Sequence, residues 1–148
     1  MAINDWSDGV LCVDSDLEEY ESNIQEWVSN FGSCEKWRIK AKDEIEQRLR
    51  HGLRQIEIDT DEDDVLDLIS SYDPLKNPAC FMTLHLLCND LSTNSADHWA
   101  TKSEMYYRKF QDSWPIALGL IHLDIDESGT IEDDEKYNVP GVTFVRGN

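Results

Sequence analysis

Residues 75–91 of this chain read LKNPACFMTLHLLCNDL, and this stretch decides the fold. Apolar side chains, mainly leucine, cysteine, phenylalanine and methionine, occupy almost every side of a helix drawn through it. A helix that is apolar all round is stable only where other elements cover it. Pro78 falls in the first turn, where a missing backbone N–H costs little. The stretch therefore predicts a central helix with other helices around it.

The segments on both sides of this stretch carry apolar residues at helical spacing. One stripe lies in residues 14–31, a second in 33–53 and a third after Ser95, which is the expected N-cap; a short helix is expected at 63–69. Pro115 is expected to kink or interrupt the last helix. The stripes consist of Leu17, Tyr20, Ile24, Trp27 and Val28, of Trp37, Ala41, Ile45, Leu49 and Leu53, and of Trp99, Ser103, Tyr106, Phe110 and Trp114. The expected fold class is mostly α, a bundle of four to five helices.

Both ends of the chain lack helical periodicity. Pro140 and Gly141 break helix near the C-terminus, and a short β-prone run follows them. The predicted organisation is an extended N-terminal arm over residues 1–13, a helical bundle domain over 14–136 and an extended C-terminal tail over 137–148. The arm is expected to pack through Ile3, Trp6, Val10 and Leu11.

Charge is the most unusual feature of the composition. The 148 residues include 31 acids and 13 bases, a formal net charge of −18. The acids form blocks at 1–30, 57–73 and 122–135, whereas the bases concentrate in 34–54, which we interpret as a solvated helix face. Such a surface repels phosphate, so sequence-independent binding of nucleic acid is not expected. Two interpretations stay open: an acidic surface that only keeps the chain in solution, or one that faces basic partners or lets DNA pass without adhering.

The common catalytic motifs are missing from the sequence. It contains no phosphate-binding loop, nucleophile elbow or paired metal histidines, and its four histidines share no ligand spacing. The four cysteines show no zinc spacing; Cys80 and Cys88 are expected to be small buried side chains, which fits a reducing compartment. No run approaches the ~18 apolar residues of a membrane helix. The chain is therefore expected to act by binding or assembly and not as an enzyme.

One motif is specific. Residues 124–135, DIDESGTIEDDE, reproduce the twelve-residue calcium loop of EF-hands, with Gly129 at the turn position. The candidate calcium ligands are Asp124, Asp126, Ser128, Thr130 and Glu135. A second loop is absent from the sequence and Pro140 follows too soon for an exiting helix, so calcium sensing through helix opening is not expected. A structural calcium clip and a metal-free acidic turn both stay open.

Taken together, several segments resemble the head–tail connector, or adaptor, proteins of tailed bacteriophages. The likeness spans roughly residues 14–146 and is one of pattern. The segments that carry it are Asp16–Glu21 (DLEEYE), Ala41–Ile45 (AKDEI), Asp64–Leu68 (DVLDL), Leu75–Ala79 (LKNPA), Asn89–Leu91 (NDL), the residues Asp97, Lys102, Glu104, Tyr106 and Phe110, and Pro140–Arg146 (PGVTFVR).

This resemblance implies a helical subunit of the virion neck that is assembled in the host cytoplasm. Such subunits commonly form a twelve-fold ring, a dodecamer, that binds the portal protein on one side and a tail or stopper protein on the other. DNA would pass through the ring during genome ejection as a non-specific passenger, and an acidic lining suits that conduit. The resemblance brings no catalytic or cofactor residues.

The tail is the expected contact with partners. Alternation places Val142 and Phe144 on one side of a short strand and Thr143 and Val145 on the other, and Arg146 adds a positive charge. A strand this short needs an edge or groove to pair with. It either docks on a neighbouring subunit or the portal, or folds back on its own domain near residues 55–58. The alternative function is a small intracellular acidic calcium-binding or regulatory protein with a single EF-hand-like loop.

Overall fold

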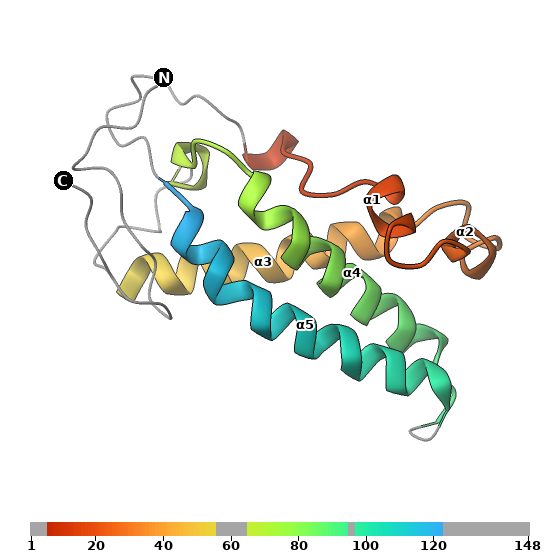
Figure 1. Ribbon diagram of the computed structural model, residues 1–148. Helices are drawn as coiled ribbons and strands as arrows, with labels where there is room; N and C mark the ends of the chain where they lie inside the picture. The colour runs from red at the N-terminus through yellow and green to blue at the C-terminus, as the bar shows by residue number, and fades with distance from the viewer. Residues whose placement is uncertain (1–5, 56–64, 95–96, 123–148) are drawn as a thin grey trace. The chain divides into compact units, whose positions relative to one another are not determined.

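The computed structural model (Figure 1) describes residues 6–55, 65–94 and 97–122. These residues form five α-helices, three short 3-10 helices and no β-strand. The α-helices are α1 (Asp14–Glu18), α2 (Ile24–Trp27), α3 (Glu35–Gln55), α4 (Lys76–Leu91) and α5 (His98–Leu120), and the 3-10 helices are η1 (Trp6–Asp8), η2 (Val65–Leu68) and η3 (Asp73–Leu75). The predicted class, a mostly helical fold of four to five helices, is confirmed.

The chain divides into two compact units, and two of the four boundaries between them fall inside α3 and α5. Unit 1 consists of Met1–Val10, Glu46–Leu75 and Trp114–Asn148, and unit 2 consists of Leu11–Ile45 and Lys76–Ser113. The arm, bundle and tail predicted from the sequence remain a prediction, because residues 1–5 and 123–148 lie outside the described part of the chain.

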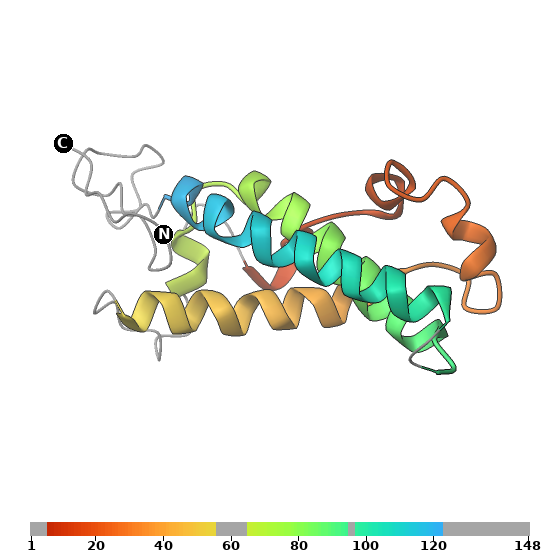
Figure 2. The ribbon, with the colours of Figure 1, turned by 60° about the horizontal axis from the view of Figure 1, so that its bottom comes forward.

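Helix α4 is the core of unit 2. It runs side by side with α5 in the opposite direction in both views (Figures 1 and 2). Helix α1 also contacts it. Burial reaches around most of its circumference, since Pro78, Ala79, Cys80, Met82, Thr83, Leu84, Leu87 and Cys88 are all buried. This burial confirms the central position expected from residues 75–91.

The first amphipathic segment is not one helix, contrary to the prediction for residues 14–31. It breaks into α1 and α2. At the end of α1 the backbone N–H of Tyr20 donates to the Leu17 carbonyl oxygen at 3.0 Å, an i+3 bond that tightens the last turn, beside the i+4 bond from Glu21 at 3.0 Å. The apolar face is nevertheless real: Leu17, Ile24 and Val28 are fully buried. Side-chain contacts made by Tyr20 and Glu21 favour the turn over helix continuation. Gly32, at a φ of 84°, then turns the chain toward α3.

The second amphipathic segment forms the 21-residue helix α3. Its predicted apolar stripe is buried at Trp37, Ala41, Ile45 and Leu49. In unit 2, the indole nitrogen of Trp37 donates a hydrogen bond of 2.8 Å to the carboxylate of Asp90, at the end of α4. The polar anchor and the apolar stripe together fix which side of α3 faces the core of this unit.

Helix α5 differs from expectation at its start. Asp97, not Ser95, stands directly before its first residue and accepts a hydrogen bond of 2.8 Å from the backbone N–H of Ala100; Ser95 lies outside the described residues. Of the two alternatives at Pro115, a new helix capped by Ser113 is wrong, because α5 continues through the proline to Leu120, and a kink remains a prediction. A proline inside a helix removes one backbone donor and crowds the preceding turn. Burial of Ala117 and Leu118, which follow Pro115 in the helix, offsets the cost of the lost backbone hydrogen bond.

Unit 1 is organised around Trp6. Its backbone N–H donates to Asp67 at 2.6 Å, its indole N–H donates to Glu46 at 2.6 Å, and its ring meets Tyr72 edge-on at 5.3 Å. A Cβ at Gly9 would lie 2.6 Å from the Tyr72 ring, so this approach requires glycine. The expected packing of the arm is confirmed at Trp6 and, in unit 2, at Leu11. It is wrong at Val10, which is 63% exposed.

Candidate functional site

Both sites predicted from the sequence lie outside the described residues. These are the calcium loop, with Asp124, Asp126, Ser128, Thr130 and Glu135, and the partner-binding tail, with Val142, Phe144, Val145 and Arg146. The structure therefore brings none of them together and separates none of them. Within residues 6–55, 65–94 and 97–122, no three His, Cys, Asp or Glu side chains are placed to hold a metal ion.

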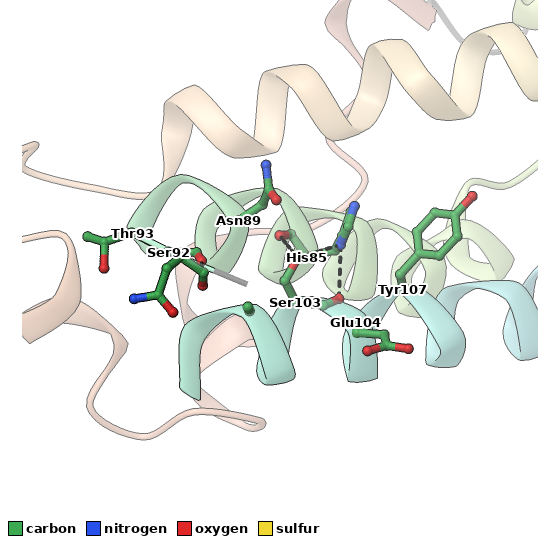
Figure 3. A pocket seen from close by; sticks show the side chains of 9 residues that line it. His85, Asn89, Ser92, Thr93, Ser103, Glu104 and Tyr107 are labelled. Atoms are coloured by element: carbon green, nitrogen blue, oxygen red, sulfur yellow. Dashed lines mark hydrogen bonds between the residues drawn. The ribbon is translucent and has the colours of Figure 1, made fainter. Parts of the chain in front are cut away.

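An open hollow of about 620 Å³ lies in unit 2, between α4 and α5 (Figure 3). It is lined mainly by hydroxyl, amide and imidazole groups: His85, Asn89, Ser92, Thr93, Asn94, Ala100, Ser103, Glu104 and Tyr107. Ligand sites are usually concave and mostly apolar, with a few convergent polar groups. This hollow is polar and shallow instead.

His85 and Ser103 form the only hydrogen-bonded pair of side chains drawn in the hollow (Figure 3). The Nδ1 atom of His85 lies 2.9 Å from both the carbonyl and the hydroxyl oxygen of Ser103, and that hydroxyl lies 3.0 Å from the His85 carbonyl oxygen. All groups are satisfied when Nδ1–H donates to the Ser103 carbonyl and the Ser103 hydroxyl donates to the His85 carbonyl. In that arrangement the hydroxyl proton is directed away from the imidazole. The pair joins α4 to α5 in unit 2.

Asp97 fixes the turn that borders the hollow. Its carboxylate accepts hydrogen bonds from the backbone N–H groups of Ala100, Thr93 and Asn94 and from the hydroxyls of Ser92 and Thr93, at 2.7 to 3.3 Å. These bonds favour the ionised form, so they hold the pKa of Asp97 well below its usual range, with the Ala100 bond the largest cause. The residue is thus a structural N-cap for α5.

A second feature lies on the outward side of the first turns of α3 and of the loop just before it. We name it the α3 outer face and define it as Phe31, Lys36, Ile39 and Lys40. Phe31 and Ile39 are 56% and 55% exposed, and both lysines are exposed. The Phe31 ring packs edge-on against Trp37 at 5.1 Å, and the Lys36 ammonium sits 5.8 Å from the centroid of Phe31 and 5.3 Å from that of Trp37. Two apolar and two cationic side chains therefore share one exposed surface of unit 2.

The first acidic block of the sequence has two roles in unit 2. Three of its carboxylates are paired: Asp14 with Arg38 at 2.9 Å, Asp16 with Lys76 at 3.0 Å and Glu21 with Lys102 at 2.6 Å. A hydrogen bond from the backbone N–H of Val13, followed by Lys76, lowers the pKa of Asp16. The exposed carboxylates of Glu18, Glu19 and Glu26, which we name the acidic edge, form no ion pair in the described part of the chain.

All four cysteines are buried free thiols, which confirms the expectation for Cys80 and Cys88. Burial raises the pKa of both Cys34 and Cys88 to about 12. A hydrogen bond between the thiols of Cys12 and Cys80 lowers the pKa of Cys12 and raises that of Cys80. The thiol of Cys12 also lies 3.9 Å from the Thr83 hydroxyl. Buried thiols with raised pKa values pack as small apolar groups.

Sequence reasoning missed three features, and two of them had a signal. Phe31 and Ile39 fall outside the apolar stripe of α3, which marks them as outward apolar residues. The run Ser92–Thr93–Asn94 ahead of Asp97 is typical of a capped turn. The pairing of His85 with Ser103 had no signal, because it depends on the relative register of two helices.

Comparison with known proteins gives no relative. No protein-family model matches the chain, and no curated protein and no solved structure matches it either. In the part of the chain that the structure describes, no helix combines the length and the apolar character needed to cross a membrane.

Proposed function

We propose that the protein is a virion assembly adaptor: a head–tail connector subunit that forms a ring between portal and tail and lets DNA pass. The ring is a dodecamer, and its partners are further copies of the chain, the portal protein and a tail or stopper protein. The proposal begins from the resemblance of residues 14–146 to such adaptors.

The observation that best supports a role in assembly is the α3 outer face. Large apolar side chains that are exposed together next to charged groups are typical of protein-binding surfaces. Phe31 and Ile39 are each more than half exposed although unit 2 has a well-formed core. On a chain of net charge −18, a surface that carries two unpaired lysines is suited to binding an acidic protein.

The charge of the chain supports the conduit function. Each subunit carries 18 more negative than positive charges, so a ring of subunits repels the DNA backbone. The same repulsion opposes self-association in free solution. We therefore expect the isolated chain to be a monomer or a weak oligomer that forms a ring only on a partner.

Co-expression with the portal protein of the same genome tests the proposal. Native mass spectrometry of the purified complex is expected to show twelve copies of the chain on one portal ring, whereas the chain alone is expected to show low-mass species. A chain that binds no portal-type ring would rule out the adaptor function. A stable large ring of the isolated chain would contradict the need for a template.

A further inference from the structure

The basic side chains of unit 2 are mostly engaged within the unit. Arg38, Lys76, Lys102 and Arg108 form ion pairs with carboxylates, whereas Lys109, on α5, contacts aromatic rings and no carboxylate in the described part of the chain. Lys36 and Lys40 differ from the four paired residues: neither is ion-paired with a carboxylate in the described residues, and both flank Ile39 on the exposed side of α3.

Lys36 is also held in place. Its ammonium group lies over the rings of Phe31 and Trp37, and this cation–π contact orders a side chain that would otherwise sample many rotamers. An ordered charge loses less conformational entropy when it binds a partner than a mobile one does. Phe31 and Ile39 add exposed apolar surface, and binding of a partner at the α3 outer face would bury that surface away from water.

The acidic edge supplies the complementary charge. Glu18, Glu19 and Glu26 are exposed and unpaired among the described residues, whereas Asp14, Asp16 and Glu21 of the same segment are neutralised by basic side chains. Within the ranges that the structure describes, unit 2 thus presents exposed lysines without a carboxylate partner on the α3 outer face and exposed carboxylates without a basic partner in the acidic edge, where Glu18 accepts only a hydrogen bond of 3.3 Å from the Gln25 amide.

We propose that the α3 outer face of one copy binds the acidic edge of the next copy, head to tail. A two-fold contact of the α3 outer face with itself would place lysines against lysines, so like-with-like pairing is unfavourable. A head-to-tail contact joins opposite charges at every junction, and repetition of such a contact produces a ring when the rotation closes. The proposal rests on the proposed ring assembly and names the surfaces that make it.

A nucleic acid is the competing occupant of the lysines. Two cations on a chain of charge −18 provide few phosphate contacts, and the surrounding field repels the backbone. The apolar residues at the centre of the face also have no counterpart on a phosphate backbone. A protein surface with exposed carboxylates can pair with the two lysines of the α3 outer face and also cover its two apolar side chains.

Two charge-reversal variants test the contact by sedimentation velocity at low salt and up to millimolar concentration. Lys36→Glu/Lys40→Glu reverses the α3 outer face, and Glu18→Lys/Glu19→Lys reverses the acidic edge. Each variant alone is expected to self-associate at least about tenfold more weakly than the wild type. An equimolar mixture of the two is expected to associate again, because every junction in the mixture joins opposite charges.

Matched controls separate this contact from a general effect of net charge. Arg108→Glu/Lys109→Glu and Glu104→Lys/Asp112→Lys make the same charge changes on exposed positions of α5. Both controls are expected to associate as the wild type does, and circular dichroism should show wild-type helix content in all four variants, since every substituted residue is exposed.

Several outcomes overturn the contact: wild type that stays monomeric throughout, either variant associating like the wild type, controls that weaken equally, or a mixture that fails to associate. Loss of DNA binding in Lys36→Glu/Lys40→Glu, with unchanged self-association, assigns the lysines to nucleic acid instead. The adaptor function is judged separately by portal binding. If the wild type and both variants occupy the portal ring equally well, the adaptor function is supported and the head-to-tail contact is overturned.

Discussion

The hydroxyl of Tyr106 donates a hydrogen bond of 2.6 Å to the carboxylate of Glu21, which lies 85 positions earlier in the chain. Lys102 donates to the same carboxylate oxygen at 2.6 Å. Tyr106 is 2% exposed, so α5 holds the segment after α1 through a buried phenol and a partly buried ion pair of unit 2.

Removal of this phenol is expected to destabilise the protein. Tyr106→Phe should lower the free energy of unfolding by about 1–2 kcal/mol, because Glu21 loses a hydrogen bond in a partly buried site. Urea titration followed by circular dichroism measures the loss. Tyr20→Phe is the matched control, because its hydroxyl makes only an exposed hydrogen bond of 3.2 Å to Asn77. Equal losses in the two variants would contradict the importance of the Glu21 contact.

The same phenol makes stability depend on alkaline pH. Burial, followed by the hydrogen bond to Glu21, raises the pKa of Tyr106. The folded state therefore holds this proton more tightly than the unfolded state does. The stabilisation that the Tyr106 proton provides is complete below about pH 10, the pKa of a tyrosine in the unfolded chain, and is lost as the pH rises above that value. Tyr106→Phe should show a flatter decline of melting temperature above that pH than the wild type.

Asp97 is expected to control stability on the acid side. Its pKa is depressed in the folded state by the hydrogen bonds of its turn, so its contribution is complete above the unfolded pKa of about 4 and is lost as the pH falls toward the folded value. Asp97→Asn should lower the melting temperature at neutral pH and flatten its dependence on pH below about 4. Asp112→Asn, at an exposed position of α5, is the control and should keep the wild-type slope. The same slope of melting temperature against pH in the wild type, Asp97→Asn and Asp112→Asn would be inconsistent with this role.

The thiols are expected to be unreactive in the folded protein. Burial raises the pKa of Cys34 and Cys88 to about 12, so these two hold little thiolate near pH 8. The pKa of Cys12 is lowered instead, and its protection, like that of the other three, comes from burial of the sulfur atom. A colorimetric thiol reagent should label all four cysteines in denaturant and react far more slowly without it. Rapid labelling of the folded chain would show that unit 2 opens readily.

The loop Asp124–Glu135 yields a test that distinguishes its two interpretations. Calcium bound by the folded state alone should raise the melting temperature, and Glu135→Gln should abolish the increase. Magnesium should substitute poorly, because it requires a smaller octahedral site. A melting temperature that millimolar calcium leaves unchanged would identify the loop as an acidic turn without metal.

Truncation of the tail distinguishes docking on a partner from folding back. If residues such as Val142, Phe144 and Arg146 bind a neighbouring subunit or the portal, deletion of residues 139–148 should leave the melting temperature unchanged and abolish assembly on the portal. A melting temperature lowered by several degrees would assign the tail to the core of its own chain. Val142→Ser/Phe144→Ser provides a milder variant of full length.

The sequence predicted elements well where one physical effect dominates. Residues 75–91 have no polar side to expose, so burial of α4 follows from composition alone. Trp37, Ala41, Ile45 and Leu49 repeat with a single period, and α3 follows them. The break between α1 and α2 could not be predicted, because Tyr20 and Glu21 form hydrogen bonds with residues far along the chain.

The candidate sites were less accessible to sequence reasoning for a similar reason. The lysines of α3 had a solvated helix face as their simplest explanation, and only the exposure of Phe31 and Ile39 shows what accompanies them. Which carboxylates of the first acidic block remain unpaired depends on the positions of Arg38, Lys76 and Lys102 in space. Local spacing contains no information on such partners.

The anchoring of Glu21 by α5 also sets the order in which the chain can fold during its synthesis. The segment around α1 leaves the ribosome first, but its partners Lys102 and Tyr106 are made more than 80 residues later. Closing a loop of that length has an entropic cost that only the completed contact offsets. The contacts of Glu21 must therefore wait until α5 has emerged. The acids of the segment around α1 repel one another during that interval, which keeps the nascent chain extended and discourages premature collapse.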